Sequence, residues 1–195
     1  MKLKKSNKLN NFLSKLDNHN ISYVSWKSNH ELKSAMSGFG DIDLFVPLNS
    51  SSKFVDLCRS DGWVEVFNPI AVYPWIKHFY GLGDNSKVFH IHVYFKLITG
   101  DSWIKEYCLP FEKWIIENRE WSSNYDIWVM NNISQAYLFL IRHLIKNGTF
   151  VGRLLYMRNF TTYHEEWKHC CNNVRLKDVQ GPIDVGKYLE GSGVF

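Results

Sequence analysis

Two aspartates lie one residue apart in the stretch "GDIDLFV", residues 40–46. The apolar residues after them are typical of a buried strand, and alternate residues of a strand point to the same face. Asp41 and Asp43 therefore present two carboxylates side by side, both ionised at neutral pH because an ordinary aspartate has a pKa near ~3.9. Their repulsion favours a divalent cation between them. Magnesium is bound in this way, by one or two carboxylates together with substrate phosphates.

The same pair has a simpler interpretation. Two aspartates at the mouth of a strand also arise by chance, as a solvated pair or as a cap of a neighbouring loop. An unpaired buried charge is costly, so these carboxylates need a cation, hydrogen bonds or water. Gly40, directly before the pair, removes a side chain at a point where a ligand or a second backbone can approach. We favour the metal-binding interpretation because of the ordered motifs around the pair.

A second stretch with polar side chains on one strand face lies further along the chain. Residues 76–97 predict a hairpin whose turn is "GDNS", residues 83–86. One face of its second arm is apolar, with Phe89, Ile91, Val93, Phe95 and Leu97. The other face carries His90, His92, Tyr94 and Lys96. A polar strand face opposite an apolar one is expected to face water, a ligand or a cleft.

The remaining patterns predict the elements that hold these strands. Apolar residues at helical spacing predict a helix over residues 6–18. Further expected elements are strands at 21–26, 63–67 and 125–130, and helices at 50–62, 109–121, 132–147 and within 150–171. This order predicts an α+β fold, a small mixed sheet backed by helices, with a helical C-terminal segment. We expect a core over 1–130, a helical segment over 131–178 packed on it, and a loosely ordered tail over 179–195.

The predicted helix at 132–147 has the strongest apolar stripe in the chain. Asn132 with Gln135 resembles a capping box at its start. Arg142 and Lys146 lie four residues apart on it, and we interpret them as a solvated helix face rather than a phosphate clamp.

Composition limits the classes of function. The chain has 195 residues, 45% of them hydrophobic, and no stretch approaches the ~20 apolar residues of a membrane span. The N-terminus lacks the features of a signal peptide, so we expect a cytoplasmic protein with four reduced cysteines and no CxxC zinc motif. A net charge of +4 suits an anionic small molecule such as a nucleotide. Because the basic residues form no dense stripe, nucleic acid is disfavoured as a partner.

Five stretches in order resemble a known family. "YVSWKS", "GDIDLFV", "HIHVYFKLITGD", "LPFEKW" and "RHLIKNGTFVG" are similar to a nucleotidyltransferase-like domain of the polymerase-beta-type superfamily. This branch occurs in bacterial surface-polysaccharide clusters, with a thymidylate-kinase-like domain fused or encoded nearby. The resemblance covers roughly residues 20–155. It implies that Asp41 and Asp43 bind Mg²⁺ (or Mn²⁺), with a kinase-like domain as a partner.

The resemblance also assigns a phosphate-contacting turn and a third carboxylate. The turn corresponds to "SWKS", so Ser25, Lys27 and Ser28, together with Gly40, are the expected cofactor-binding residues. The usual glycine of this turn is missing, but Lys27 can meet phosphate as a point charge.

The third carboxylate of the superfamily lies on a neighbouring strand. By register its position here is His92, so that carboxylate is absent. An imidazole can accept a proton or bind a metal, but it moves the metal preference away from magnesium. We predict Asp41, Asp43 and His92 as the catalytic residues.

Three functions remain open. The first is metal-dependent transfer of a nucleotidyl group from a nucleoside triphosphate to a small acceptor such as a sugar phosphate, in surface polysaccharide biosynthesis. The second is a nucleotide-binding or interaction module without turnover, which the missing carboxylate permits. The third is a metal-dependent hydrolase that uses Asp41, Asp43, His90 and His92.

Two further expectations concern Asp43 and the C-terminus. We expect Asp43→Asn to abolish divalent-metal-dependent nucleotide binding and to leave the fold intact, because an exposed or cleft carboxylate contributes little to stability. No G-x-x-x-x-G-K-[ST] motif is present for a kinase-type phosphate loop. We expect residues beyond about 178 to be poorly packed, in an excised first half of a longer protein or a natural stand-alone version of the domain. Deletion of 180–195 should then leave the melting temperature almost unchanged.

Overall fold

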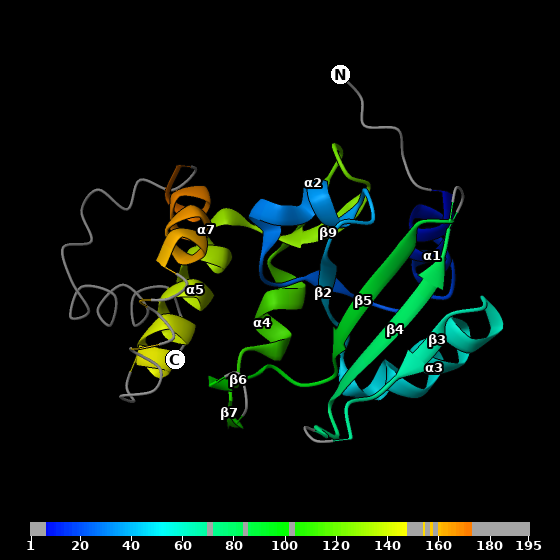
Figure 1. Ribbon diagram of the computed structural model, residues 1–195, viewed down its shortest axis with the longest axis horizontal. Coiled ribbons are helices and arrows are strands. Elements are labelled where there is room, and N and C mark those ends of the chain that lie inside the picture. The colour runs from blue at the N-terminus through cyan, green and yellow to red at the C-terminus, as the bar shows by residue number, and fades with distance from the viewer. Residues whose placement is uncertain are drawn as a thin grey trace.

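The computed structural model describes residues 7–69, 72–83, 86–101, 104–147, 154, 157 and 160–172. Within these residues a mixed sheet of seven strands forms the centre of the protein (Figure 1). In spatial order its strands are β3 (Val64–Val66), β4 (Ile76–Leu82), β5 (Val88–Tyr94), β2 (Asp41–Phe45), β1 (Val24–Ser25), β9 (Ile127–Met130) and β8 (Arg119–Ser122). The strands β2 and β5 run parallel, as do β1 and β9, and the other neighbours are antiparallel.

Helices pack against both faces of this sheet. The described helices are α1 (Asn7–Asn18), α2 (Leu32–Ala35), α3 (Ser51–Ser60), α4 (Glu112–Glu117), α5 (Asn132–Asn147) and α7 (Phe160–Asn172), and α7 packs against α5. Short 3-10 turns, η1 (Asn29–Glu31) and η2 (Leu48–Ser50), precede α2 and α3, and β6 (Ile98–Asp101) pairs with β7 (Ile104–Cys108) in a separate hairpin. The described part is therefore α+β, as predicted.

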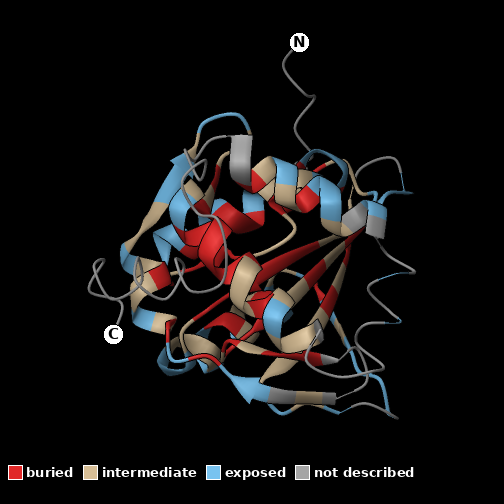
Figure 2. Cartoon of the chain, turned by 90° about the vertical axis from the view of Figure 1, so that its left-hand side faces the viewer, coloured by how far each residue is buried: buried red, intermediate tan, exposed pale blue. Residues whose placement is uncertain are grey.

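One face of the sheet is covered by α1 and α3. The apolar stripe of α1 is completely buried, with Leu9, Phe12, Leu13 and Leu16 each at most 1% exposed. It meets Phe54 of α3, whose ring lies 5.7 Å from that of Phe12 and 5.9 Å from that of Phe79 on β4. Alternate residues of β5, such as Ile91 and Val93, complete this core. Buried residues lie in the interior of the protein, and exposed residues lie on its outer surface (Figure 2).

The opposite face is only partly covered. Helices α4 and α5 pack over β1, β2 and β9 through a second core that includes Ile115, Leu138, Val24, Phe45 and Met130. On β4 and β5 the same face carries half-buried histidine and tyrosine side chains instead of a helix. The boundary between the covered and the open part runs beside β2, the strand that carries the aspartates.

Most predicted elements are present, with three corrections. The helix predicted at 109–121 is wrong beyond Glu117, because the following residues form β8 and pair with β9. The strand predicted at 21–26 is reduced to the two residues of β1. The cap of α5 is Asn131 rather than Asn132, because its side-chain oxygen accepts the hydrogen bond from the backbone N–H of Ser134, at 2.8 Å.

Some expectations fall outside the described residues. These are the tail at 179–195, the end of the predicted segment at 131–178, most of 148–159 and the tip of the 83–86 turn. The division at residue 130 and the deletion of 180–195 therefore stay predictions.

A glycine in β4 is required by close packing. A Cβ atom added to Gly81 would lie 2.7 Å from the ring of Trp63, which is itself buried. We expect Gly81→Ala to destabilise the protein by ~1–3 kcal/mol through overpacking, which corresponds to a fall in Tm of ~2–12 °C at this chain length. Thermal unfolding measures this, with Ser52→Ala at an exposed position of α3 as the control. An unchanged Tm would show that the Trp63 ring moves aside freely.

Candidate functional site

The aspartate pair lies on a central strand, next to the strand of the histidines. β2 pairs in parallel with β5, so that Asp43 is opposite His92 and Asp41 is opposite His90. This arrangement confirms the prediction that the two strands are neighbours. Because paired positions point to the same face, the Asp43 and His92 side chains meet on the partly open face of the sheet.

Asp41, Asp43 and His92 form a compact group of possible metal ligands. The His92 Nδ1 atom lies 3.0 Å from Asp43 Oδ1 and 3.5 Å from Asp41 Oδ2. One ligand atom from each residue can be chosen so that all lie within 4.8 Å of one another. Two carboxylate oxygens and one imidazole nitrogen suit a divalent cation, and the nitrogen favours transition metals more than an all-oxygen site does. The three residues can thus hold a metal ion whose identity the geometry leaves open.

Lys27 lies against the buried member of the pair. Its ammonium nitrogen is 2.9 Å from Asp43 Oδ1 and donates a hydrogen bond of 2.9 Å to the Tyr94 hydroxyl. The Asp43 side chain is 4% exposed and that of Lys27 is 17% exposed. Burial alone would raise the pKa of Asp43, but the charge of Lys27 and the contact with His92 hold it well below its ordinary value.

The two aspartates therefore differ in environment. Asp41 is 41% exposed, and its pKa is lowered mainly by the hydrogen bond with His92. Asp43 is not the exposed or cleft carboxylate that we expected from the sequence, because its side chain is buried and contacts Lys27. The expectation that Asp43→Asn leaves stability unchanged is revised accordingly in the Discussion.

The expected phosphate-contacting turn has a local structure of its own. Ser25 is buried, and its hydroxyl donates to Asn29 Oδ1 at 2.6 Å. Ser28 adopts the left-handed conformation, with φ of 58°, at a point where glycine would be favoured. Its backbone N–H contacts Glu166 Oε1 at 3.5 Å. Gly40 has φ of +122°, a backbone conformation that requires glycine although a Cβ at this position would meet open space.

Arg142 is a functional candidate that the sequence did not reveal. It was expected on a solvated helix face, but it is 8% exposed and its Nη1 donates to Glu166 Oε1 at 3.1 Å. Its guanidinium lies 5.4 Å from the centre of the Trp26 ring, and Lys27 lies 5.6 Å from that same ring. The solvated-face interpretation is therefore wrong for Arg142. No sequence signal links it to Glu166, 24 residues further along.

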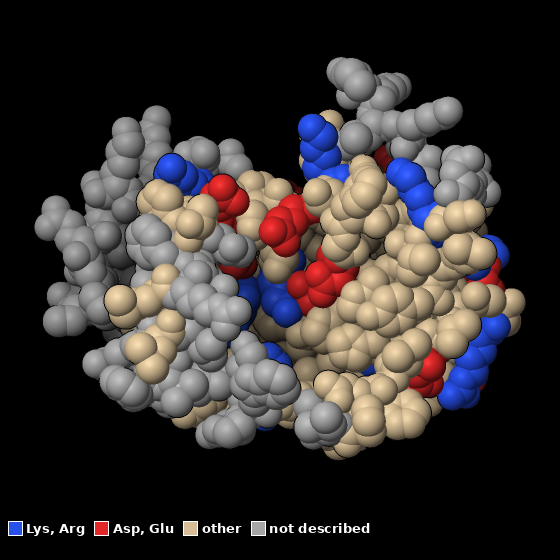
Figure 3. Space-filling model, viewed as in Figure 1, with Lys and Arg blue, Asp and Glu red and all other residues tan. Residues whose placement is uncertain are grey.

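Lys146 follows Arg142 by one turn of α5. Burial lowers its pKa to about 7, and the nearby charges of Arg142 and Lys27 add to the effect. Basic side chains thus gather beside the aspartates. Figure 3 shows a hollow between the surface over α5 and α7 and the surface over β4 and β5, with Lys or Arg atoms inside it and Asp or Glu atoms next to them.

The open face beyond His92 carries a row of aromatic rings. His78 on β4 is opposite His92, and their rings stack with centroids 4.3 Å apart. His78 Nδ1 lies 3.0 Å from His90 Nε2, and Tyr80 stacks on His90 at 4.3 Å. His90 is thus hydrogen-bonded to His78 and does not belong to the group of three possible ligands. Tyr94 lies on the strand face that was expected to meet water, a ligand or a cleft, but it is buried and accepts a hydrogen bond from Lys27.

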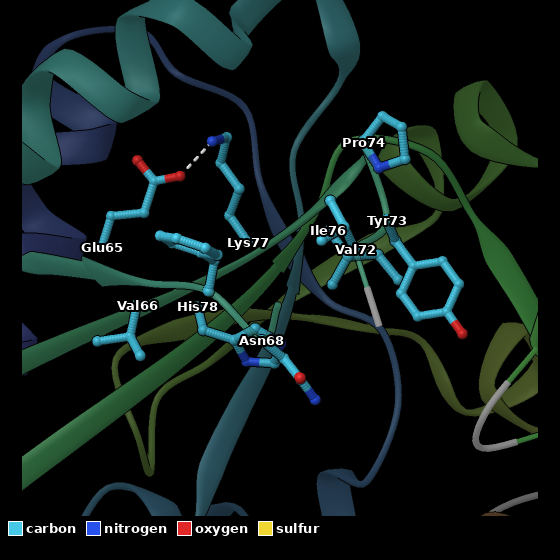
Figure 4. A pocket seen from close by; sticks show the side chains of 10 residues that line it. Glu65, Val66, Asn68, Val72, Tyr73, Pro74, Ile76, Lys77 and His78 are labelled. Carbon is cyan, nitrogen blue, oxygen red and sulfur yellow. Dashed lines mark hydrogen bonds and ion pairs between the residues drawn. The ribbon is translucent and has the colours of Figure 1, made fainter. Parts of the chain in front are cut away.

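A small pocket adjoins this row at the edge of the sheet. Its volume is about 140 Å³, and Val66, Val72, Ile76 and His78 belong to its lining. Figure 4 shows these side chains together with the ion pair between Lys77 and Glu65. His78 thus separates the pocket from His92.

The histidine row predicts a loss of stability in mild acid. Burial lowers the pKa of His78 from 6.5 to about 4, with His92 and His90 contributing. The unfolded chain therefore binds a proton at higher pH than the folded chain, so stability falls as the pH drops from ~6.5 to ~4. After allowance for partial exposure we expect ~1–3 kcal/mol.

Urea unfolding at about pH 7.5 and about pH 5 measures this loss. His78→Phe keeps the ring stack and should lose less stability on acidification than the native protein. The matched control is His19→Phe at an exposed position. An equal loss in the native protein and in His78→Phe would show that His78 is not the titrating group.

None of the described helices combines the length and the apolar character needed to cross a membrane. The sequence matches no family model and no curated protein.

Proposed function

We propose that this protein is a divalent-metal-dependent nucleotidyltransferase of the polymerase-beta type. The observation that carries the proposal is the pair Asp41 and Asp43 on a central strand, with His92 on the next strand within ligand distance. Lys27 contacts Asp43, and Arg142 lies against the same Trp26 ring as Lys27. Two carboxylates and an imidazole that can hold a divalent cation are what a metal–nucleotide substrate requires of its site.

The proposed reaction transfers a nucleotidyl group to an acceptor hydroxyl or phosphate oxygen. The acceptor oxygen forms a bond to the α-phosphorus of a nucleoside triphosphate, the bond from that phosphorus to the β-bridging oxygen breaks, and pyrophosphate leaves. A divalent ion held by Asp41, Asp43 and His92 would neutralise phosphate charge in this step. Lys27 compensates the charge of Asp43, and a proton from a hydroxyl acceptor passes to solvent.

The acceptor in this proposal is a small molecule such as a sugar phosphate. This part rests on the resemblance to domains of surface-polysaccharide clusters, in which a thymidylate-kinase-like partner is common. The hollow has both basic and acidic side chains at its surface, which suits a small charged ligand (Figure 3).

A nucleotide-binding module without turnover is the second candidate. The observation that favours it is His92, which lies opposite Asp43 at the position where the superfamily has a carboxylate. An imidazole can be neutral and then does not replace the negative charge of that carboxylate. The hydrolase alternative has less support, because His90 is bonded to His78 rather than grouped with the carboxylates.

Isothermal titration with nucleoside triphosphates and Mg²⁺ or Mn²⁺, followed by a pyrophosphate-release assay with sugar phosphates, tests the proposal. We expect nucleotide binding that requires the metal, and pyrophosphate release that requires an acceptor. Metal-dependent binding without release would favour the binding module. Binding that ignores the metal would contradict both. Tightly bound zinc in the purified protein, with phosphoester hydrolysis and no transfer, would favour the hydrolase.

A further inference from the structure

The ammonium group of Lys27 is held in place by several partners. It contacts Asp43 Oδ1 at 2.9 Å and the Tyr94 hydroxyl at 2.9 Å. It also makes cation–π contacts with two aromatic rings, because it lies 4.8 Å from the centre of the Tyr94 ring and 5.6 Å from the centre of the Trp26 ring. Asp43, Tyr94 and Trp26 are all buried. If Lys27 left this position, a buried carboxylate oxygen would lose its ion pair, which is unfavourable.

The charges of the site limit how many cations it can take. Asp41 and Asp43 bring two negative charges and Lys27 brings one positive charge. One divalent ion would change the local sum from one negative to one positive charge. A nucleoside triphosphate brings further negative charges of its own, so the limit on a second ion is one of position: that ion would have to bind where the Lys27 ammonium already contacts Asp43 Oδ1, at 2.9 Å. Arg142 does not alter this sum, because Glu166 pairs with it.

The two aspartates also differ in access. Lys27 contacts Asp43, whereas Asp41 contacts His92 and is 41% exposed. A metal ion therefore has an open approach from the Asp41 side, and the Asp43 side already has a cation.

We propose that Lys27 is a built-in second cation of the site, and that the protein binds one divalent ion per chain rather than two. The ion lies on the Asp41 side, and the Lys27 ammonium remains at Asp43 when a nucleotide binds. This inference rests on the proposed function only in requiring a divalent ion at the aspartate pair. It assigns Lys27 to charge compensation of Asp43 instead of to a mobile phosphate contact.

Titration of the native protein with Mn²⁺, followed by electron paramagnetic resonance of the free ion, tests the proposal. The titration is made alone and with a non-hydrolysable nucleoside triphosphate, after subtraction of Mn²⁺ bound by the nucleotide itself. We expect one bound ion per chain in both cases. Two ions per chain with the nucleotide would overturn the inference but leave the proposed function standing. Absence of any bound Mn²⁺ would overturn both.

Substitution of Lys27 supplies an independent readout. Lys27→Met removes the positive charge, so we expect Mn²⁺ to bind about tenfold more tightly or better and a second ion to appear with the nucleotide. Lys27→Arg keeps the charge and should still bind one ion, and it decides the question if the methionine variant does not fold. Lys53→Met, on the exposed side of α3, is the matched control. Unchanged Mn²⁺ affinity and stoichiometry in Lys27→Met would contradict the assigned role.

Discussion

Asp43→Asn is expected to remove metal-dependent nucleotide binding and to destabilise the protein at the same time. The substitution leaves the Lys27 ammonium without its carboxylate in a position that is 17% exposed. Removal of one partner of a buried ion pair costs ~3–5 kcal/mol. Since asparagine retains one acceptor oxygen for Lys27, we expect ~3 kcal/mol, or a fall in Tm of ~6–12 °C.

The pH dependence of this contribution has a defined sign. The pKa of Asp43 is lowered in the folded state by Lys27 and His92, which outweigh the effect of burial. The stabilisation is therefore complete above the unfolded-state pKa of ~3.9 and is lost as the pH falls through the lower, folded-state pKa. Asp43→Asn should lack this acid-sensitive part of the stability.

Asp41→Asn is the matched control for the Asp43 substitution. Asp41 contacts His92 but is 41% exposed, so its neutralisation should change Tm by no more than a few degrees. It should nevertheless weaken metal binding at least as strongly as Asp43→Asn does, because Asp41 belongs to the ligand group and has no lysine partner of its own among the described contacts. If both variants lost stability equally, the different environments of the two aspartates would be refuted. If Asp41→Asn bound Mn²⁺ normally, the ligand assignment would fail.

Arg142→Met is expected to have the second large effect. It leaves Glu166, which is 7% exposed, without its cation, at a cost of ~3 kcal/mol or more. Glu166 also accepts the backbone contact from Ser28. The substitution should therefore loosen α7 and the turn after β1 together, which faster amide hydrogen exchange in both segments would reveal.

A double-mutant cycle isolates the Arg142–Glu166 interaction. We expect Arg142→Met and Glu166→Gln each to destabilise, and the double variant to be more stable than the sum of the two losses predicts. The control is Lys168→Met on the exposed side of α7. Strict additivity of the two losses would show that the pair contributes no specific coupling.

The fold was largely predictable from local periodicity. The apolar spacing of α1 and the alternation of β5 each mark one buried face, and these faces form the first core. Register followed from the same alternation, since one-residue slippage would have turned Ile91 outward and His92 inward. The short strand β8 was missed because "WIIENREW" is apolar at helical spacing, and only the pairing with β9 reveals its extended form.

The site was predictable only in part, because its partners are distant in sequence. Asp41, Asp43 and His92 follow from one strand pair and its register. Lys27 was expected to meet phosphate, but its ion pair with Asp43 depends on the folded position of the turn after β1. Arg142 and Glu166 come from two helices that the sequence does not relate, so a pair of like charges on one helix was interpreted as solvated. Charge neutralisation across elements has no local pattern in the sequence.

The most direct test of a metal–nucleotide site at the aspartate pair is the anomalous scattering of Mn²⁺ in crystals soaked with a non-hydrolysable nucleoside triphosphate. The site described here predicts an anomalous peak within metal-bond distance, ~2.0–2.6 Å, of a carboxylate oxygen of Asp41 or Asp43, with phosphate oxygens of the nucleotide in the same coordination sphere. A Mn²⁺ peak remote from both aspartates, or a nucleotide bound elsewhere on the protein, would contradict it.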